Sequence, residues 1–122
     1  MDATLQPNGP GVLPMFVERK DATVNVASLV PELTTALAKI GRIHQDLFDK
    51  PLIITSANDG KHTPASKHYV NKAVDVRTID KSPAEQLLFI TVLSYLSNSL
   101  RLMLFDERLL PGSDHVHLET AD

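Results

Sequence analysis

The sequence lacks cysteine, a long apolar run and an excess of basic residues, and each absence excludes a class of protein or site. Without cysteine the chain has no disulfides and no thiolate ligands for zinc, so a metal site must use His, Asp or Glu. The longest apolar stretch, residues 87–96, is interrupted by Thr91 and Ser94 and is too short to cross a bilayer. A net charge of −3 provides no basic stripe for nucleic acid. We therefore expect neither a membrane nor a nucleic-acid partner.

Length and composition predict one small domain. The chain has 122 residues, of which 43% are hydrophobic, and this is enough to bury a core. Residues 1–14 contain three prolines and two glycines, which predict an extended N-terminal arm that could pair with a partner. Residues 15–122 are then expected to form the folded domain.

Two helices and several short strands are predicted within this domain. Apolar residues recur at helical spacing from Val30 to Leu47, with Pro31 in the opening turn, and Pro51 ends this helix. A capping box at residues 82–85 begins a second helix, which extends to about residue 97 and is apolar over most of its surface. Short strands are expected at residues 15–17 and 23–26, buried strands at 52–55 and 102–105, and polar-faced strands at 73–78 and 115–119. This composition is typical of an α+β domain with two helices packed on one face of a mostly antiparallel sheet.

The last two strands each have one polar and one apolar face. Strand alternation places Asp75 with Ala73 and Arg77, and it places His117 with His115 on the polar face of its own strand. If the two strands are neighbours, their apolar faces are buried together and Asp75 lies beside His117.

A third polar residue would reach the same place from the loop before residue 73. His68 lies seven residues before Asp75, and Asn71 suits a tight turn because asparagine tolerates positive φ. Two imidazoles and one carboxylate leave a fourth tetrahedral position open for water, as in catalytic zinc sites. Five histidines in 122 residues could also produce these spacings by chance, so spacing alone leaves both interpretations open.

The segments around these residues resemble the signature of the LAS-type zinc peptidases. This family includes D-alanyl-D-alanine carboxypeptidases, the L-alanyl-D-glutamate endolysin peptidases of phages and the hedgehog signalling domain. The matching segments are residues 55–62 (TSANDGKH), 66–77 (SKHYVNKAVDVR) and 114–117 (DHVH). The family pattern S-x-H-x-x-G-x-A-x-D, followed by a strand with the last histidine, is matched except at its glycine, which is Asn71 here. The resemblance extends from about residue 30 to residue 119 and implies the hedgehog/DD-peptidase fold, with Zn²⁺ bound by His68, Asp75 and His117.

The resemblance also implies a catalytic acid or base just before the last ligand. Family members use an acidic residue three positions before it, here Asp114, or a histidine two positions before it, here His115. Strand alternation places His115 on the ligand face, while Gly112 and Ser113 could turn the backbone enough to bring Asp114 in. We favour Asp114 as the base, with His115 supporting a ligand or the oxyanion, and both assignments remain open.

Three further residues are candidates for binding substrate. Many members carry an arginine before the first ligand, where it binds a substrate carboxylate or stabilises the oxyanion, and this chain has only Lys61 in that segment. Ser66 and Arg77 complete the candidate set. Lysine provides a point charge without the bidentate fork of arginine, so substrate would be held differently. Lys61 and Arg77 are also compatible with ordinary surface cations.

These features predict a zinc metallopeptidase that cleaves peptidoglycan stem peptides by means of a zinc-bound water. The alternative is a non-catalytic module, either a phage virion or assembly component or a cell-wall-binding domain, that retains the fold and the metal site. The absent arginine favours this module, and the presence of all three ligands with Asp114 favours the enzyme. Residues from Met1 onward have neither a basic region nor an apolar core, so we expect no signal peptide. The expected protein is synthesised in the cytoplasm, and three fates remain open: release by phage lysis, incorporation into a virion, or a role as a cytoplasmic recycling enzyme. The N-terminal arm could mediate assembly into a virion or a homo-oligomer.

Overall fold

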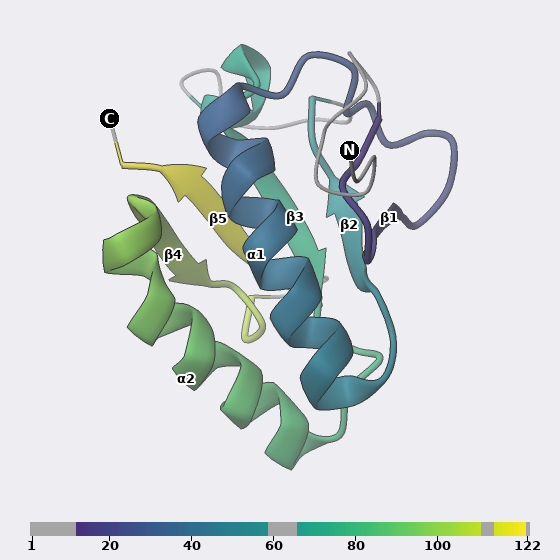
Figure 1. Ribbon diagram of the computed structural model, residues 1–122, viewed down its shortest axis with the longest axis vertical. Coiled ribbons are helices and arrows are strands. Elements are labelled where there is room, and N and C mark those ends of the chain that lie inside the picture. The colour runs from purple at the N-terminus through teal and green to yellow at the C-terminus, as the bar shows by residue number, and fades with distance from the viewer. Residues whose placement is uncertain (1–11, 59–65, 111–113, 122) are drawn as a thin grey trace, which may run out of the picture.

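The computed structural model describes residues 12–58, 66–110 and 114–121. Within these residues the chain forms a small α+β domain, as predicted, with a five-stranded sheet and two long helices on one of its faces (Figure 1). The helices are α1 (Pro31–Phe48) and α2 (Pro83–Leu100). The strands are β1 (Val17–Arg19), β2 (Leu52–Ser56), β3 (Ala73–Arg77), β4 (Leu102–Asp106) and β5 (His115–Thr120). Among the described helices, none is both long enough and apolar enough to span a membrane.

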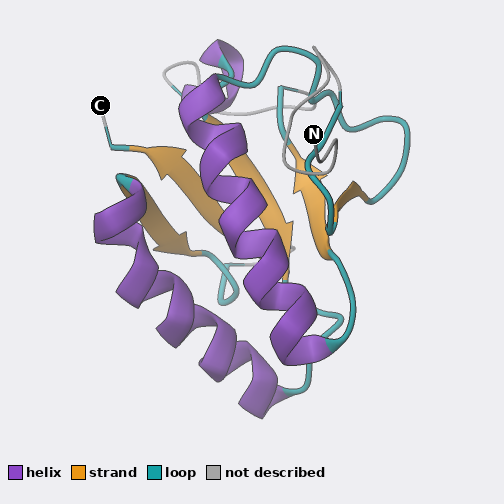
Figure 2. Cartoon of the chain, viewed as in Figure 1, coloured by secondary structure: helices purple, strands orange, loops and turns teal. Residues whose placement is uncertain are grey.

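The sheet has the order β1-β2-β3-β5-β4 and is mixed (Figure 2). β1 and β2 are parallel, and the other three neighbouring pairs are antiparallel. The central strands bury one face under the helices through Val74, Val76, Val116 and Leu118, each no more than 1% exposed. Alternate residues of β3 and β5 therefore face away from the helices, and this second face contains the candidate site.

Both helices begin where their sequences predict, and α2 ends at Leu100, beyond the predicted end at about residue 97. α1 starts at Pro31 and ends at Phe48, and the left-handed conformation of the following Asp49 lets its backbone N–H donate to the Gln45 carbonyl at 2.9 Å. α2 has the predicted capping box, because the Ser82 hydroxyl accepts from the Glu85 N–H and the Glu85 carboxylate accepts from the Ser82 N–H. The apolar surface of α2 is only partly used for packing. Phe89 and Leu93 are buried, whereas Leu87, Leu88 and Tyr95 are exposed.

Two strand predictions near the N-terminus are wrong. The first lies at Val17–Arg19 rather than at residues 15–17, because Phe16 has a φ of 68° and cannot continue a strand. Residues 23–26 form no strand but a turn and a loop, in which the Asp21 carboxylate accepts hydrogen bonds from the backbone N–H and hydroxyl of Thr23. Their apolar alternation reflects Val24 and Val26, which are buried in the core from a loop.

The predicted burial of residues 102–105 is also wrong. These residues do form β4, but it is an edge strand in which only Leu102 is buried. Met103 and Phe105 are 43% and 42% exposed. They share a face of β4, so this edge places apolar side chains beside the polar face of β5.

Candidate metal centre

The pairing of β3 with β5 brings the two predicted strand ligands together. Asp75 lies directly opposite His117, as expected if the two strands were neighbours, and Arg77 lies directly opposite His115. All four project from the face of the sheet opposite the helices, because the intervening valines and leucine occupy the core. Asp75 is buried on this face and is only 6% exposed.

His68 reaches the same place from a short 3-10 helix, Lys67–Val70, that precedes β3. The Ser66 hydroxyl caps this helix by accepting the backbone N–H of His68 at 3.2 Å. Asn71 ends it with the predicted positive φ, 62°, and donates its backbone N–H to the His68 carbonyl. Ser66, a candidate for binding substrate, therefore has a local role in holding His68 in place.

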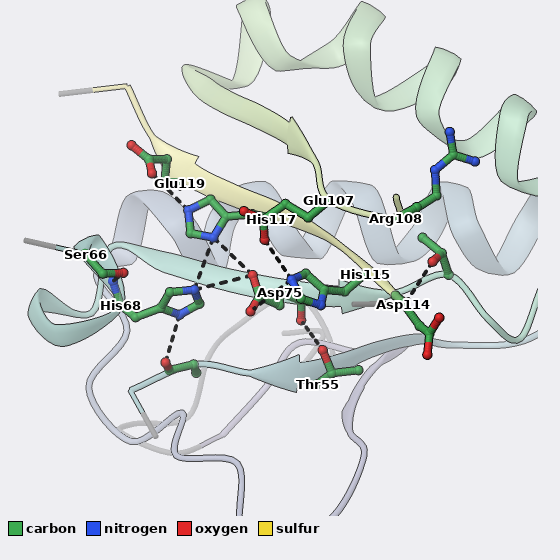
Figure 3. Close-up of polar contacts among 12 residues, drawn as sticks. Thr55, Ser66, His68, Asp75, Glu107, Arg108, Asp114, His115, His117 and Glu119 are labelled. Carbon is green, nitrogen blue, oxygen red and sulfur yellow. Dashed lines mark hydrogen bonds and ion pairs between the residues drawn. The ribbon is translucent and has the colours of Figure 1, made fainter. Parts of the chain in front are cut away.

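Three side-chain atoms converge at the centre of this site (Figure 3). His117 Nδ1 lies 3.0 Å from Asp75 Oδ1 and 3.1 Å from His68 Nε2, and His68 Nε2 lies 3.4 Å from Asp75 Oδ1. A tetrahedral ion with bonds of about 2.0–2.1 Å places its ligand atoms about 3.3 Å apart. The three separations are therefore those of one face of a coordination tetrahedron, and the group can hold a metal ion.

The outer nitrogens of both rings determine which tautomers meet at the centre. His68 Nδ1 lies 2.8 Å from the Ala57 carbonyl, and His117 Nε2 lies 2.9 Å from a carboxylate oxygen of Glu119. Both partners are acceptors, so each outer nitrogen donates its N–H. A neutral ring then presents a lone pair to the centre. This arrangement of an outer acceptor that orients each ring is typical of metal-binding histidines.

Three lone pairs facing one another repel unless a proton or a cation lies among them. Burial raises the pKa of Asp75, but hydrogen bonds from His117 and His68 outweigh this effect and hold it well below its ordinary value. Burial lowers the pKa of His117, but hydrogen bonds to Asp75 and Glu119 prevail and raise it. A proton on His117 and a metal ion therefore satisfy the same electrostatic requirement, and the two would compete.

A salt bridge between Lys67 and Glu119 joins the segments that carry the first and last candidate ligands, His68 and His117. Lys67 Nζ lies 3.2 Å from a carboxylate oxygen of Glu119 and donates to the Thr120 carbonyl at 2.7 Å. Lys67 immediately precedes His68, and Glu119 accepts from His117. The contact joins the loop that carries one histidine to the strand that carries the other.

Glu107 is a site residue that the sequence interpretation missed. It follows β4, and its carboxylate lies 2.7 Å from His115 Nε2, which lies 3.6 Å from Asp75 Oδ2 (Figure 3). Potential ligand atoms of Asp75, Glu107 and His115 lie within 4.8 Å of one another. The signal was in the pairing of β4 with β5. The strands are antiparallel and Asp106 is opposite Val116, so Glu107, which follows Asp106, lies beside His115, which precedes Val116.

The remaining candidate residues are more peripheral. Asp114 precedes β5, its carbonyl accepts from the Thr78 N–H and hydroxyl at 2.9 and 2.8 Å, and its carboxylate points away from the three converging atoms (Figure 3). Arg77 lines a cavity of about 380 Å³ that also includes Lys20, Asp75, Asp114 and His115. Lys61 and the predicted turn at residues 112 and 113 lie outside the described residues, as does most of the N-terminal arm.

Comparisons with protein-family models, curated proteins and solved structures find no match.

Proposed function

We propose that the protein is a zinc-dependent peptidase of the hedgehog/DD-peptidase fold that hydrolyses peptide bonds in peptidoglycan stem peptides. The observation that carries this proposal is the convergence of His68 Nε2, Asp75 Oδ1 and His117 Nδ1 at separations of 3.0–3.4 Å. The resemblance of the surrounding sequence to the zinc peptidases supplies the substrate class.

The donor set favours zinc over magnesium and calcium. Two imidazole nitrogens and one carboxylate oxygen are ligands that zinc accepts at tetrahedral spacing, whereas magnesium and calcium prefer sites made only of oxygen. Three protein ligands are also the number found in catalytic zinc sites, where the fourth position is open. Bound zinc supplies a Lewis acid and a water molecule that ionises near neutral pH.

The chain itself provides the means to orient a peptide beside this centre. Stem peptides carry free carboxylates, and Arg77 and Lys20 place two cations around the cavity next to Asp75 and His115. Met103 and Phe105 present apolar side chains on neighbouring β4, and the Phe105 ring lies 5.6 Å from the ring of His117. A peptide bound across this face would have an anionic group near the cations and apolar groups near β4.

One observation favours the alternative, a non-catalytic virion, assembly or cell-wall-binding module. The carboxylate of Asp114, the predicted base, points away from the three converging atoms. Such a module would keep the metal for stability and would bind peptidoglycan without cleaving it.

Incubation of zinc-loaded protein with purified peptidoglycan, followed by mass analysis of the soluble fragments, tests the proposal and identifies the bond. We expect fragments whose masses correspond to hydrolysis within the stem peptide. The matched control is His117→Ala, which lacks a candidate ligand and should release none. Binding of wild-type protein to peptidoglycan without any fragment would favour the non-catalytic module.

A further inference from the structure

We infer that Glu107, held by His115, is the catalytic acid/base of this site in the place predicted for Asp114. The inference rests on the proposed function and adds a residue outside the motifs that carry the family resemblance. It depends on the position of one carboxylate at the rim of the metal centre.

Glu107 combines proximity to the centre with access to solvent. Its side chain is 32% exposed, compared with 21% for His115 and 8% for Asp75. One carboxylate oxygen, Oε1, lies 2.7 Å from His115 Nε2, while Oε2 forms no hydrogen bond within the described part of the chain. A proton acceptor needs such an oxygen, close to the metal-bound position and free to take a proton.

The His115 side chain lies close to two carboxylates, those of Glu107 and Asp75, which have different roles in the site. Its Nε2 lies between Glu107 Oε1, at 2.7 Å, and Asp75 Oδ2, at 3.6 Å. Asp75 directs its other oxygen, Oδ1, at His68 and His117. Asp75 therefore belongs to the converging group, whereas Glu107 approaches that group from outside. His115 acts as a positioning residue, because its N–H holds the Glu107 carboxylate within 4.8 Å of an Asp75 carboxylate oxygen.

The backbone around Asp114 favours Glu107 over Asp114 for this role. Both hydrogen bonds from Thr78 to the Asp114 carbonyl fix the peptide that enters β5. With this peptide fixed, strand alternation directs His115 to the site and Asp114 away from it. Bringing the Asp114 carboxylate to the centre would require breaking both bonds and changing the face of His115.

In the reaction, the Glu107 carboxylate accepts one proton from the attacking water as the new C–O bond forms at the scissile carbonyl carbon. Glu107 then donates this proton to the departing nitrogen as the C–N bond breaks. The products are a carboxylic acid and an amine, and Glu107 returns to its ionised form.

The test compares three variants for zinc content and for hydrolysis of peptidoglycan. Glu107→Gln should bind zinc in the wild-type amount while hydrolysis falls roughly 100- to 10,000-fold, the usual effect of losing a general base. Glu18→Gln makes the same chemical change on exposed β1 and should hydrolyse at the wild-type rate. Asp114→Asn should retain more activity than Glu107→Gln.

Two substitutions of His115 separate positioning from a merely structural role. His115→Ala should lower the rate of hydrolysis while zinc content stays at the wild-type level, because Glu107 loses the N–H that orients it. His115→Gln restores an N–H donor at a similar distance and should recover part of the rate.

Several results would overturn the inference. Wild-type hydrolysis by Glu107→Gln would exclude Glu107 as the base, and an inactive Asp114→Asn beside an active Glu107→Gln would return the role to Asp114. A second zinc ion per wild-type chain that Glu107→Gln loses would make Glu107 a ligand instead. A wild-type protein that cleaves nothing would refute the proposed function and this inference together, whereas active wild type with active Glu107→Gln refutes the inference alone.

Discussion

Substitution of Glu119 with glutamine should weaken zinc binding, although it changes none of the three candidate ligands. The Glu119 carboxylate accepts from His117 Nε2 at 2.9 Å and is itself paired with Lys67 at 3.2 Å. This contact fixes the ring so that Nδ1 faces Asp75, and its negative charge makes His117 a better donor to a cation. The amide keeps the shape of the side chain and removes the charge.

The expected magnitude follows from the loss of one charge-assisted hydrogen bond. Such a bond contributes roughly 1.5–3 kcal/mol, and each 1.4 kcal/mol corresponds to about a tenfold change in affinity. We therefore expect zinc affinity to fall about 10- to 100-fold, the range seen for outer-shell partners of metal-binding histidines.

Competition with a chromophoric chelator at fixed pH measures this affinity directly. Glu18→Gln, which removes the same charge from exposed β1, is the matched control and should bind zinc as the wild type does. Unchanged affinity in Glu119→Gln, together with lost binding in His117→Ala, would refute the positioning role of Glu119. If metal-free Glu119→Gln were much less stable than metal-free wild type, any weaker zinc binding would be explained by unfolding instead.

Three further measurements test other parts of the structure. His68→Ala should reduce zinc from one ion per chain to almost none by elemental analysis, and full retention would contradict the ligand assignment. Burial lowers the pKa of His44, so its contribution to stability is present above the ordinary pKa of an imidazole and declines as pH falls below it. Urea unfolding at pH 7.5 and 5.5 should show a smaller loss of stability on acidification in His44→Leu than in wild type, and equal losses would count against this account. Gly41→Ala should destabilise the fold by about 1–3 kcal/mol in the same assay, because the added Cβ would lie 2.5 Å from Val17 Cγ2 and 3.1 Å from the Phe16 carbonyl oxygen. An unchanged midpoint would mean that β1 can move away from α1.

The converging residues could be predicted from the sequence because their placement depends on local rules. Once β3 and β5 pair, alternation within each strand puts Asp75 and His117 on one face, and the left-handed Asn71 allows the turn that presents His68. Helix boundaries were equally accessible, since proline, the capping box and helical spacing act over a few residues.

The features that were missed depend on tertiary contacts or on single backbone conformations. The position of β1 follows from the left-handed conformation of Phe16, which no pattern of apolar residues reveals. The exposure of β4 follows from its place at the sheet edge. Glu107 meets His115 only because β4 and β5 pair with Asp106 opposite Val116, and no spacing along the chain specifies that register.

Alternate residues of strand β5 face the hydrophobic core and the candidate metal centre. Val116, Leu118 and Thr120 are buried beneath the helices, while His115, His117 and Glu119 face the opposite way. A slip of one residue during folding would place three polar side chains in the core and would scatter the converging group at the same time. A chain in the wrong register would have no centre to offer a metal ion, so an added ion would favour the native register over the slipped one. A deletion within β5 should for the same reason be tolerated far less well than one in a loop.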